Sequence, residues 1–461
     1  MFHFFKKGFT TSRKVSLKKV KPLKNKKITL QPQLKNLIEK MLNAQLKSWL
    51  QVNNDSHFPI QNIPFGIFIT NERNTPRVCT IIGETVIDIA ALAERGYFSE
   101  LGIDRMVFYK QYLNDLISLG KEKTSALRNR LAEIFSEGNE ELKNNFKHRE
   151  KILHNLTDVS LLMPVNIGDY TDFYSSIEHA TNVGIMFRDP ANALLPNWKH
   201  LPVGYHGRAS SIVVSGTNFH RPKGQTKADD AEIPSFGPTK QLDFELEMGF
   251  IIGKETTLGN SISTSDAEDY IFGMVLFNDW SARDIQKWEY VPLGPFLGKN
   301  FCSSISPWVV TMDALEPFKI NSTKQEPQVL PYLQYEGNKN YDIESEVSIQ
   351  PENQPPQRVS KSNFKYMYWN MCQQLAHHTV NGCNVQVGDL LASGTISGHS
   401  EDSYGSMLEL AWKGTKPIKM PDGTERKFIN DNDTVIMTGF AERDGIKIGF
   451  GEVKAKVLPA K

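Results

Sequence analysis

The chain has 461 residues, 39% of them hydrophobic and 23% charged, which is typical of a globular protein and excludes a disordered one. Residues 1–27 hold ten Lys and Arg and no acid, so the remainder carries 43 basic against 52 acidic residues, a net charge of −9. A body of that sign is not typical of a nucleic-acid-binding protein. No apolar run is long enough to span a bilayer, so we expect no membrane partner.

Residues 1–48 are predicted to be a basic N-terminal extension. Its first part, 1–27, permits a mitochondrial presequence, but it is rich in Lys where such presequences favour Arg. Four cysteines without a C-x-x-C pair indicate a reducing compartment rather than secretion. We therefore expect a cytoplasmic protein whose extension is disordered or partly helical, with apolar residues at helical spacing over Leu34–Leu50.

The next part, 49–160, is predicted to be a small β-rich domain with a helical linker. Phe65–Ile69, Val78–Ile82 and Thr85–Ile89 are short strand-like runs, and the last two are separated by a glycine-containing turn. Residues 111–155 are charged and carry leucines at helical spacing, which predicts helices.

From about Leu161 to the C-terminus, 161–461, the pattern changes to short apolar runs between Gly and Pro turns. No β-α-β rhythm is present, so we expect a mostly antiparallel β roll or barrel. Residues 317–360 are rich in Pro, Gln, Asn and Ser and are predicted to have little local order. The strand-like runs are Ser211–Val214, Phe244–Ile252, Ile271–Phe277, Trp308–Val310, Asp389–Leu391, Thr434–Thr438 and Lys447–Phe450.

Several familiar catalytic motifs are missing. No G-x-S-x-G or H-E-x-x-H is present, and Gly294–Asn300 resembles a P-loop but is one residue short between its glycines. His377 and His378 fall in a helix-like run, Tyr366–Val380. Adjacent residues of a helix point about 100° apart, so these two histidines are more often structural than paired ligands.

An acidic segment offers a metal site. In a strand, Asp243, Glu245 and Glu247 share one face, and the run continues into the apolar residues 249–252. Carboxylates side by side at the edge of a core repel one another unless a cation compensates them. Such oxygen ligands suit Ca²⁺ or Mg²⁺. The alternative is an edge strand whose acids face water.

A second acid, Asp279, follows an apolar strand. If a helix starts there, Asp279, Arg283, Gln286 and Tyr290 share one face, and Asp279 can also cap that helix. An acid, a guanidinium, an amide and a phenol together suit an anionic substrate beside a metal. The alternative is a surface stripe with an Asp–Arg ion pair.

A histidine and two further carboxylates complete the candidates. Asp172 and His179 are seven residues apart, two turns if the segment is helical, although a lone histidine is usually structural. Glu409 alternates with apolar neighbours, so it faces inward and can orient a histidine. Whether His179 and Glu409 meet does not follow from these patterns.

At these residues the chain closely resembles the fumarylacetoacetate hydrolase family, over roughly Trp49 to the C-terminus. The resemblance implies a small N-terminal SH3-like barrel, a C-terminal mixed β-sandwich roll and a homodimer. It implies hydrolysis of a carbon–carbon bond of 4-fumarylacetoacetate to fumarate and acetoacetate, the last step of tyrosine and phenylalanine breakdown. The segments that carry it are Gly168–Ser176, His179–Arg188, Leu201–Arg208, Asn278–Gln286 and Leu390–Gly398.

The resemblance also implies a divalent cation, Ca²⁺ and/or Mg²⁺, and its ligands. The matching ligand positions are Asp172, Glu245, Glu247 and Asp279. The family further places Mg²⁺ beside Asp279, Lys299 and a threonine, and this chain has Ser303 at that last position. Serine keeps a hydroxyl and a carbonyl oxygen. A protonated Lys299 cannot ligate through its ammonium, so it would contribute its carbonyl or act as a charge.

The same resemblance implies roles for the reacting groups. His179 matches the water-activating base and Glu409 its orienting partner. The groups that match oxyanion stabilisers are Arg283, Gln286 and Lys299. The positions that match substrate contacts are Tyr174, Arg188, Gln286, Tyr290 and Thr395, with Tyr205 nearby.

Two other functions compete with hydrolysis of fumarylacetoacetate. One is another enzyme of the same fold, such as an acylpyruvate hydrolase or a decarboxylase, against which Tyr174, Arg188 and Tyr290 argue. The other is a catalytically inactive binding or structural protein, against which the presence of every matched catalytic position argues.

Overall fold

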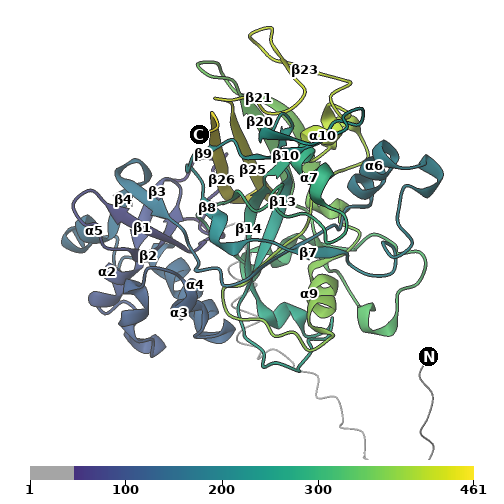
Figure 1. Cartoon of the computed structure of the whole chain (residues 1–461). Coiled ribbons are helices and arrows are strands. Elements are labelled where there is room, and N and C mark those ends of the chain that lie inside the picture. Colours follow the sequence, from purple (N-terminus) through teal and green to yellow (C-terminus); the bar gives the residue numbers. More distant parts are fainter. Residues whose placement is uncertain (1–45) are drawn as a thin grey trace, which may run out of the picture.

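The computed structural model describes residues 46–461, coloured in Figure 1. Residues 1–27, and most of the helix expected over Leu34–Leu50, lie outside the described residues. The described end of that helix, Leu46–Leu50, is not helical. Ser48 instead forms a β-bridge with Ser136, and the Trp49 amide donates to the Phe135 carbonyl at 3.2 Å, so long-range contacts override the local periodicity there.

The N-terminal part is built on a five-stranded antiparallel sheet in the order β4-β3-β2-β1-β5. The glycine turn between β2 and β3 is Gly83, at φ +62°. The three strands expected here are confirmed. Their bounds are β1 Gly66–Thr70, β2 Arg77–Ile82, β3 Thr85–Asp88, β4 Leu153–Asn155 and β5 Val159–Leu162.

Four α-helices cover this sheet: α2 Ile89–Glu94, α3 Asn114–Ile117, α4 Lys121–Phe135 and α5 Phe146–Ile152. The longest, α4, buries Leu127, Leu131 and Ile134 on one face, at spacings of four and three residues. The helical prediction for 111–155 is therefore confirmed for α3 to α5, but its last three residues form β4.

The larger part contains an eight-stranded sheet in the order β7-β6-β22-β13-β14-β16-β8, with β17 paired to β14. All of its pairs are antiparallel except β6 with β22 and β8 with β16. The bounds are β6 Tyr170–Phe173, β7 Gly204–His206, β8 Ile212–Val214, β13 Leu246–Ile252, β14 Ile271–Asp279, β16 Ser303–Ile305, β17 Val310–Thr311 and β22 Leu390–Ala392.

A second, five-stranded sheet in the order β21-β20-β25-β26-β9 packs on the first. The segment 317–360 was expected to have little order, and this is wrong for β20. Val347 and Ile349 of β20 are buried and alternate with polar residues, whose outward positions account for the misleading composition. The bounds are β9 Phe219–His220, β20 Glu344–Gln350, β21 Gln357–Asn363, β25 Thr434–Arg443 and β26 Ile446–Leu458.

The eight-stranded sheet is buried on both faces. Met274 and Leu276 of β14 belong to the core shared with the second sheet, whereas Val275 and Phe277 pack into the core of the N-terminal part. Alternate side chains of β14 thus pack into two different cores, which is why the strand is apolar from Ile271 to Phe277 and Asp279 at its end is notable. The expected mainly β fold in two parts is confirmed (Figure 1).

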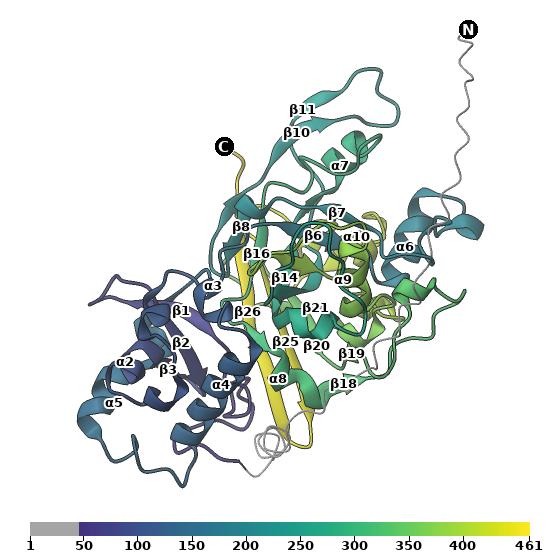
Figure 2. The same ribbon diagram turned by 90° about the horizontal axis from the view of Figure 1, so that it is seen from below.

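Shorter elements connect and flank the sheets. Figure 2 shows the hairpin of β10 (Lys223–Thr226) and β11 (Ser235–Pro238) projecting from the body beside α7 (Arg283–Glu289). The helices are α6 Ile177–Phe187, α7 Arg283–Glu289, α8 Met312–Leu315, α9 Met371–Thr379 and α10 Met407–Leu410. The paired short strands are β10 Lys223–Thr226 with β11 Ser235–Pro238, β12 Leu242–Asp243 with β15 Ser281–Ala282, β18 Lys319–Ile320 with β19 Asn340–Tyr341, and β23 Ile418–Lys419 with β24 Glu425–Arg426.

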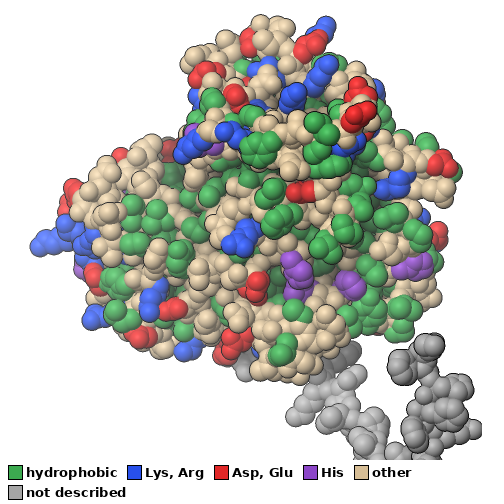
Figure 3. All heavy atoms as spheres, viewed as in Figure 1, with side chains coloured by type: hydrophobic (Ala, Val, Ile, Leu, Met, Phe, Trp, Pro, Cys, Tyr) green, Lys and Arg blue, Asp and Glu red, His purple; other side chains and the backbone are tan. Residues whose placement is uncertain are grey.

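The surface carries both signs of charge. On the face shown in Figure 3, acidic and basic side chains are interspersed over the described residues. Within residues 46–461, no helix combines the length and the apolar character needed to cross a bilayer.

Candidate active site around a buried carboxylate cluster

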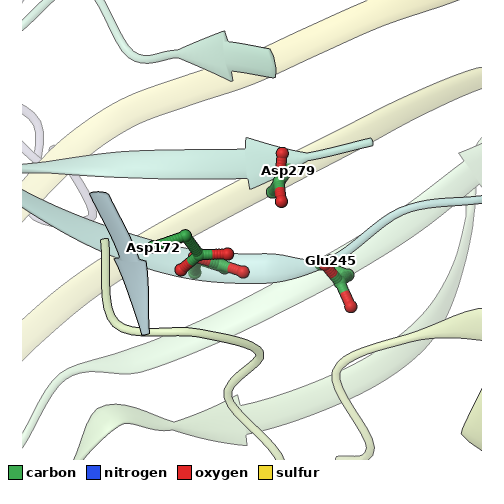
Figure 4. A group of neighbouring side chains, drawn as sticks. Asp172, Glu245 and Asp279 are labelled. Atoms are coloured by element: carbon green, nitrogen blue, oxygen red, sulfur yellow. The ribbon is translucent and has the colours of Figure 1, made fainter. Parts of the chain in front are cut away.

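Four carboxylates meet at one end of the eight-stranded sheet. They are Asp172 of β6, Glu245 just before β13, Glu247 of β13 and Asp279 at the end of β14, and one oxygen of each lies within 4.8 Å of the others. Figure 4 shows Asp172, Glu245 and Asp279 coming from separate segments and lying beside one another. All four are buried, so the alternative of a solvated edge strand does not hold.

Two cationic side chains reach one side of this cluster. Arg283 Nη2 donates to Glu245 Oε1 at 2.8 Å, and the Lys299 ammonium donates to Glu245 Oε2 and, at 2.8 Å, to Asp279 Oδ2. Burial raises the pKa of Glu245, but the charges of Arg283 and Lys299 outweigh it and hold that pKa below its usual value. Glu245 is therefore ionised and compensated by protein groups.

Asp279 has two further donors. Tyr205 donates its hydroxyl to Asp279 Oδ2 at 2.5 Å, and Ser303 Oγ donates to Asp279 Oδ1 at 2.9 Å. The structure thus brings Tyr205, Lys299 and Ser303 together around one carboxylate. The Lys299 side chain acts here as a charge, the second of the two roles that its chemistry allows.

On the other side of the cluster, Asp172 and Glu247 form no ion pair with a Lys or Arg of residues 46–461. The Gly394 amide donates to Asp172 Oδ1 at 3.0 Å and to Glu247 Oε2 at 3.1 Å. Glu247 Oε1 is buried and has no hydrogen-bond partner among the described residues. Burial, and then the neighbouring carboxylates, raises the pKa of Asp172 and of Glu247.

These observations fit a hard cation bound by oxygen. A buried carboxylate oxygen without a partner is costly, and a divalent cation at the side of Asp172 and Glu247 would satisfy it. The cluster can therefore hold a metal ion.

A buried histidine and a carboxylate that pairs with it lie next to the cluster. His179 Nδ1 is 2.6 Å from Glu409 Oε2, both side chains are buried, and His179 Nε2 is 3.9 Å from Glu245 Oε1. Burial raises the pKa of Glu409, but the charge of His179 and the hydrogen bonds to the carboxylate lower it by more, so that the pKa lies below its usual value. Glu409 is therefore an ionised acceptor. We infer that Nδ1 carries the proton, which leaves Nε2 free to accept one from water.

The local structures that hold Asp172 and His179 differ from the single helix considered from their spacing. Asp172 lies in β6 and His179 in α6, so the two-turn helical spacing was wrong. Ser176 begins α6 as its N-cap, because its hydroxyl accepts the His179 amide at 3.1 Å. The strand therefore ends before the helix starts, and His179 turns toward Glu409 of α10.

Three neutral donors that sequence patterns missed hold Glu409. Ser397 Oγ and Ser406 Oγ each donate to Oε2 at 2.9 Å, and Asn182 Nδ2 donates to Oε1 at 2.9 Å. Ser406 stands three residues before Glu409, the spacing of a helix-capping serine and glutamate, so this signal was available.

The helix after Asp279 starts later than expected. Asp279 ends β14 opposite Ser303, and the chain stays extended through β15, so α7 begins at Arg283. The single stripe of four side chains was therefore wrong, since the pairing of β15 with β12 delays the helix. Arg283 Nη1 donates to Gln286 Oε1 at 3.4 Å, and Tyr290 follows α7 with 54% of its surface exposed.

The remaining predicted substrate residues divide into two groups. The Tyr174 ring packs edge-on to His179 at 5.2 Å between centroids, and buried Thr395 follows Gly394 beside the cluster. Arg188 is exposed at the end of α6, where its Nη2 donates to the Ala193 carbonyl at 2.6 Å. Tyr174 and Thr395 are thus inside the site, whereas Arg188 and Tyr290 lie at the surface.

Two family profiles match almost the whole of this architecture. The family described as "Fumarylacetoacetase N-terminal" matches residues 61–164, and "Fumarylacetoacetate (FAA) hydrolase C-terminal" matches residues 170–458. The chain belongs to the fumarylacetoacetate hydrolase family. The expected family is confirmed, and with it a hydrolase enzyme rather than an inactive binding protein.

Curated relatives agree closely with this family. Fumarylacetoacetase of Dictyostelium discoideum is 56% identical over 420 residues, covering 90% of this chain and 98% of that protein. The human enzyme is 51% identical over 414 residues, with 90% and 99% covered, and that of Arabidopsis thaliana is 49% identical over 419 residues, also with 90% and 99% covered. A solved fumarylacetoacetate hydrolase from psychrophilic Exiguobacterium antarcticum is 17% identical, with a TM-score of 0.48, covering 87% of this chain and 100% of that one.

Proposed function

We propose that this chain hydrolyses the carbon–carbon bond of 4-fumarylacetoacetate to fumarate and acetoacetate, in tyrosine and phenylalanine breakdown. Three relatives named fumarylacetoacetase, 49–56% identical over 90% of the chain, support this substrate. The observation that carries the chemistry is the His179–Glu409 pair, with His179 Nε2 3.9 Å from a carboxylate of the cluster.

His179 is the base in this proposal. Its Nε2 takes a proton from water, and the resulting hydroxide adds to the ketone carbonyl carbon on the fumaroyl side. The bond to the acetoacetate carbon then breaks, its electron pair stays on that carbon, and the carbon takes up a proton. Glu409 keeps the imidazole in the reactive tautomer and stabilises the imidazolium that forms.

Arg283, Lys299 and Gln286 are proposed to stabilise the oxyanion that forms when hydroxide adds. Arg283 and Lys299 already converge on Glu245, where each binds a different oxygen of the carboxylate. Preorganised donors in a buried site need no reorientation during the reaction, and one such donor is worth about 3 kcal/mol, or roughly 10²–10³ in rate.

The metal ligands in this proposal are Asp172, Glu245, Glu247 and Asp279, and the ion is Ca²⁺ or Mg²⁺. The all-oxygen donor set and the unpartnered Glu247 Oε1 support a hard cation. Such an ion would polarise the carbonyl that is attacked. Asp279 also has Ser303 and Lys299 as neighbours, the positions proposed for Mg²⁺.

Substrate is proposed to contact Tyr174, Tyr205, Gln286 and Thr395 within the site, and Arg188 and Tyr290 at its rim. The guanidinium of Arg188 suits one of the two carboxylates of the substrate. An acylpyruvate hydrolase on this fold would not need those side chains. Comparing turnover of fumarylacetoacetate with that of acetylpyruvate tests the choice, and a preference for acetylpyruvate would reverse it.

We also propose a homodimer whose interface is the arm surface, the exposed apolar side chains of α7, of the segment that follows it and of the hairpin of β10 and β11. Within this surface, Trp288 of α7 packs on β10, where its indole nitrogen donates to Gln225 at 3.4 Å. Large exposed apolar patches mark interaction sites. Light scattering on Leu293→Ser should report a smaller mass than wild type, with Leu258→Ser, exposed elsewhere, as the control. The exposed side chains of the arm surface are Ile233, Phe236, Trp288, Tyr290, Val291, Leu293, Phe296 and Leu297.

The compartment is proposed to be the cytoplasm. All four cysteines are free thiols, three of them buried, which fits a reducing environment.

A further inference from the structure

Asp243 belongs to the acidic segment but lies apart from the four clustered carboxylates. Its side chain is 0% exposed and accepts three hydrogen bonds. Asp243 Oδ2 accepts from Arg283 Nε at 2.8 Å and from the Leu408 amide at 3.1 Å, and Oδ1 accepts from the Met407 amide at 2.7 Å. Both oxygens are therefore fully engaged.

The partners of Asp243 belong to two parts of the site: Arg283 beside the carboxylate cluster, and the helix α10 that carries Glu409. On one side, Arg283 uses Nε for Asp243 and Nη2 for Glu245, so the plane of the guanidinium is fixed by two carboxylates. On the other side, Met407 and Leu408 are the first two residues of α10, and the next residue is Glu409. The Asp243 carboxylate thus contacts both Arg283, the proposed oxyanion stabiliser, and α10, the helix that carries Glu409.

The backbone around Asp243 supports the same connection. The Leu246 amide donates to the Gly405 carbonyl at 2.9 Å, and Glu245 forms a β-bridge with Ser406. The backbone therefore fixes the approach to α10, while the Asp243 side chain binds the amides of its first turn. α10 is only four residues long, so the hydrogen bonds to the amides of its first turn involve half of the helix.

We propose that Asp243 is a positioning residue for the hydrolysis. Its carboxylate fixes the position of Arg283 relative to the first turn of α10. The guanidinium and the His179–Glu409 pair can then act on the same carbonyl group of the substrate. This inference rests on the proposed function, in which Arg283 and His179 serve the hydrolysis. Asp243 itself touches neither substrate nor the reacting atoms.

Asp433 provides a matched comparison within the same chain. It is 1% exposed, accepts from Arg426 Nε at 2.7 Å and Nη2 at 2.9 Å, and accepts the Asn430 amide at 2.9 Å. It is thus another buried aspartate with an arginine and a backbone amide, but none of its partners belongs to the site. A purely structural role for Asp243 predicts that the two aspartates respond alike.

The test compares Asp243→Asn with Asp433→Asn by kcat and KM on fumarylacetoacetate, corrected for folded protein. In Asp243→Asn the new side-chain NH₂ group would face N–H donors in either orientation of the amide, those of Arg283 and Leu408 or that of Met407, and donors cannot bind donors. We expect kcat of Asp243→Asn to fall about 10²-fold with KM nearly unchanged, since a misplacement of about 1 Å costs that much. Asp433→Asn should lower only the unfolding temperature.

A double substitution separates positioning through Arg283 from general damage. Arg283→Lys removes the Nε that Asp243 holds, so adding Asp243→Asn should cost less in kcat than it does in wild type. If Asp243→Asn does not fold, Asp243→Ser, whose hydroxyl can still accept the Met407 amide, replaces it in both comparisons.

The inference is overturned if Asp243→Asn keeps wild-type kcat, if its loss lies in KM alone, or if the double substitution is fully additive. Wild-type protein that does not cleave fumarylacetoacetate would instead refute the proposed function. In that case, the coupling energy between Asp243 and Arg283 in urea unfolding still measures whether the contact stabilises this arrangement.

Discussion

His179 Nδ1 lies 2.6 Å from Glu409 Oε2, although the two residues are 230 positions apart in the chain. Glu409 is also held by Ser397, Ser406 and Asn182, so its carboxylate presents one oxygen to the imidazole in a fixed direction. Nε2 is consequently the free nitrogen, and it faces the carboxylate cluster through Glu245.

Replacing His179 with glutamine should lower kcat by about 10³-fold or more, because a general base contributes about 10²–10⁴. Glutamine can still donate to Glu409, so cation affinity by calorimetry should stay at the wild-type level. His377→Gln is the control, since His377 of α9 contacts Tyr332, outside the site. A His179→Gln enzyme with near-normal turnover would remove His179 as the base.

Glu409→Gln should lower kcat by about 10³–10⁴-fold, the loss known when a carboxylate that orients a catalytic histidine becomes an amide. The amide can donate to Nδ1, which puts the imidazole proton on Nε2 and blocks acceptance from water. Steady-state kinetics measures this. Loss of less than tenfold would mean that Glu409 does not set the tautomer.

Glu247→Gln should weaken cation binding and stabilise the cation-free protein. Its buried Oε1 has no hydrogen-bond partner among the described residues, and its carboxyl group lies close to Asp172, so a neutral amide relieves a repulsion worth about 1–2 kcal/mol. Urea unfolding in the presence of a chelator measures the stability, and calorimetry measures the affinity.

For that variant, Glu425→Gln, an exposed residue of β24, serves as the control and should change neither quantity. Unchanged cation affinity in Glu247→Gln would refute its role as a ligand.

Deleting residues 1–40 should leave activity and unfolding temperature at wild-type values. The family match begins at residue 61, and the first described contacts involve Leu46, whose carbonyl accepts from Gln61 Nε2 at 2.9 Å, and Trp49. Deleting 1–52 instead should lower stability, because these contacts are lost. Loss of folding in the shorter deletion would show that the extension is structural.

Local patterns predicted the strands well, because the pattern of apolar residues along a strand depends on which faces of the sheet are buried. They failed where a distant partner decides the conformation. The pairing of β12 with β15 keeps Ser281 and Ala282 extended and moves the helix start from Asp279 to Arg283. Ser176 likewise forms a β-bridge with the distant Met367 and caps α6, so it separates Asp172 in a strand from His179 in a helix.

The candidate site shows the same limit. Motif resemblance named Asp172, Glu245, Glu247 and Asp279, and the structure brings them together. Asp243 shares their segment, yet its partners are Arg283 and the α10 amides, which no spacing rule could reveal. The difference arises because Phe244 and Glu245 lie between β12 and β13, so the three acids do not share the face of one continuous strand.

The most direct measurement of the central claim follows the absorbance of fumarylacetoacetate after addition of protein stripped with a chelator. The account predicts little loss of absorbance until Ca²⁺ or Mg²⁺ is restored, then rapid loss, with fumarate and acetoacetate in equal amounts. No loss with either cation, or equal rates in stripped and restored protein, would contradict it.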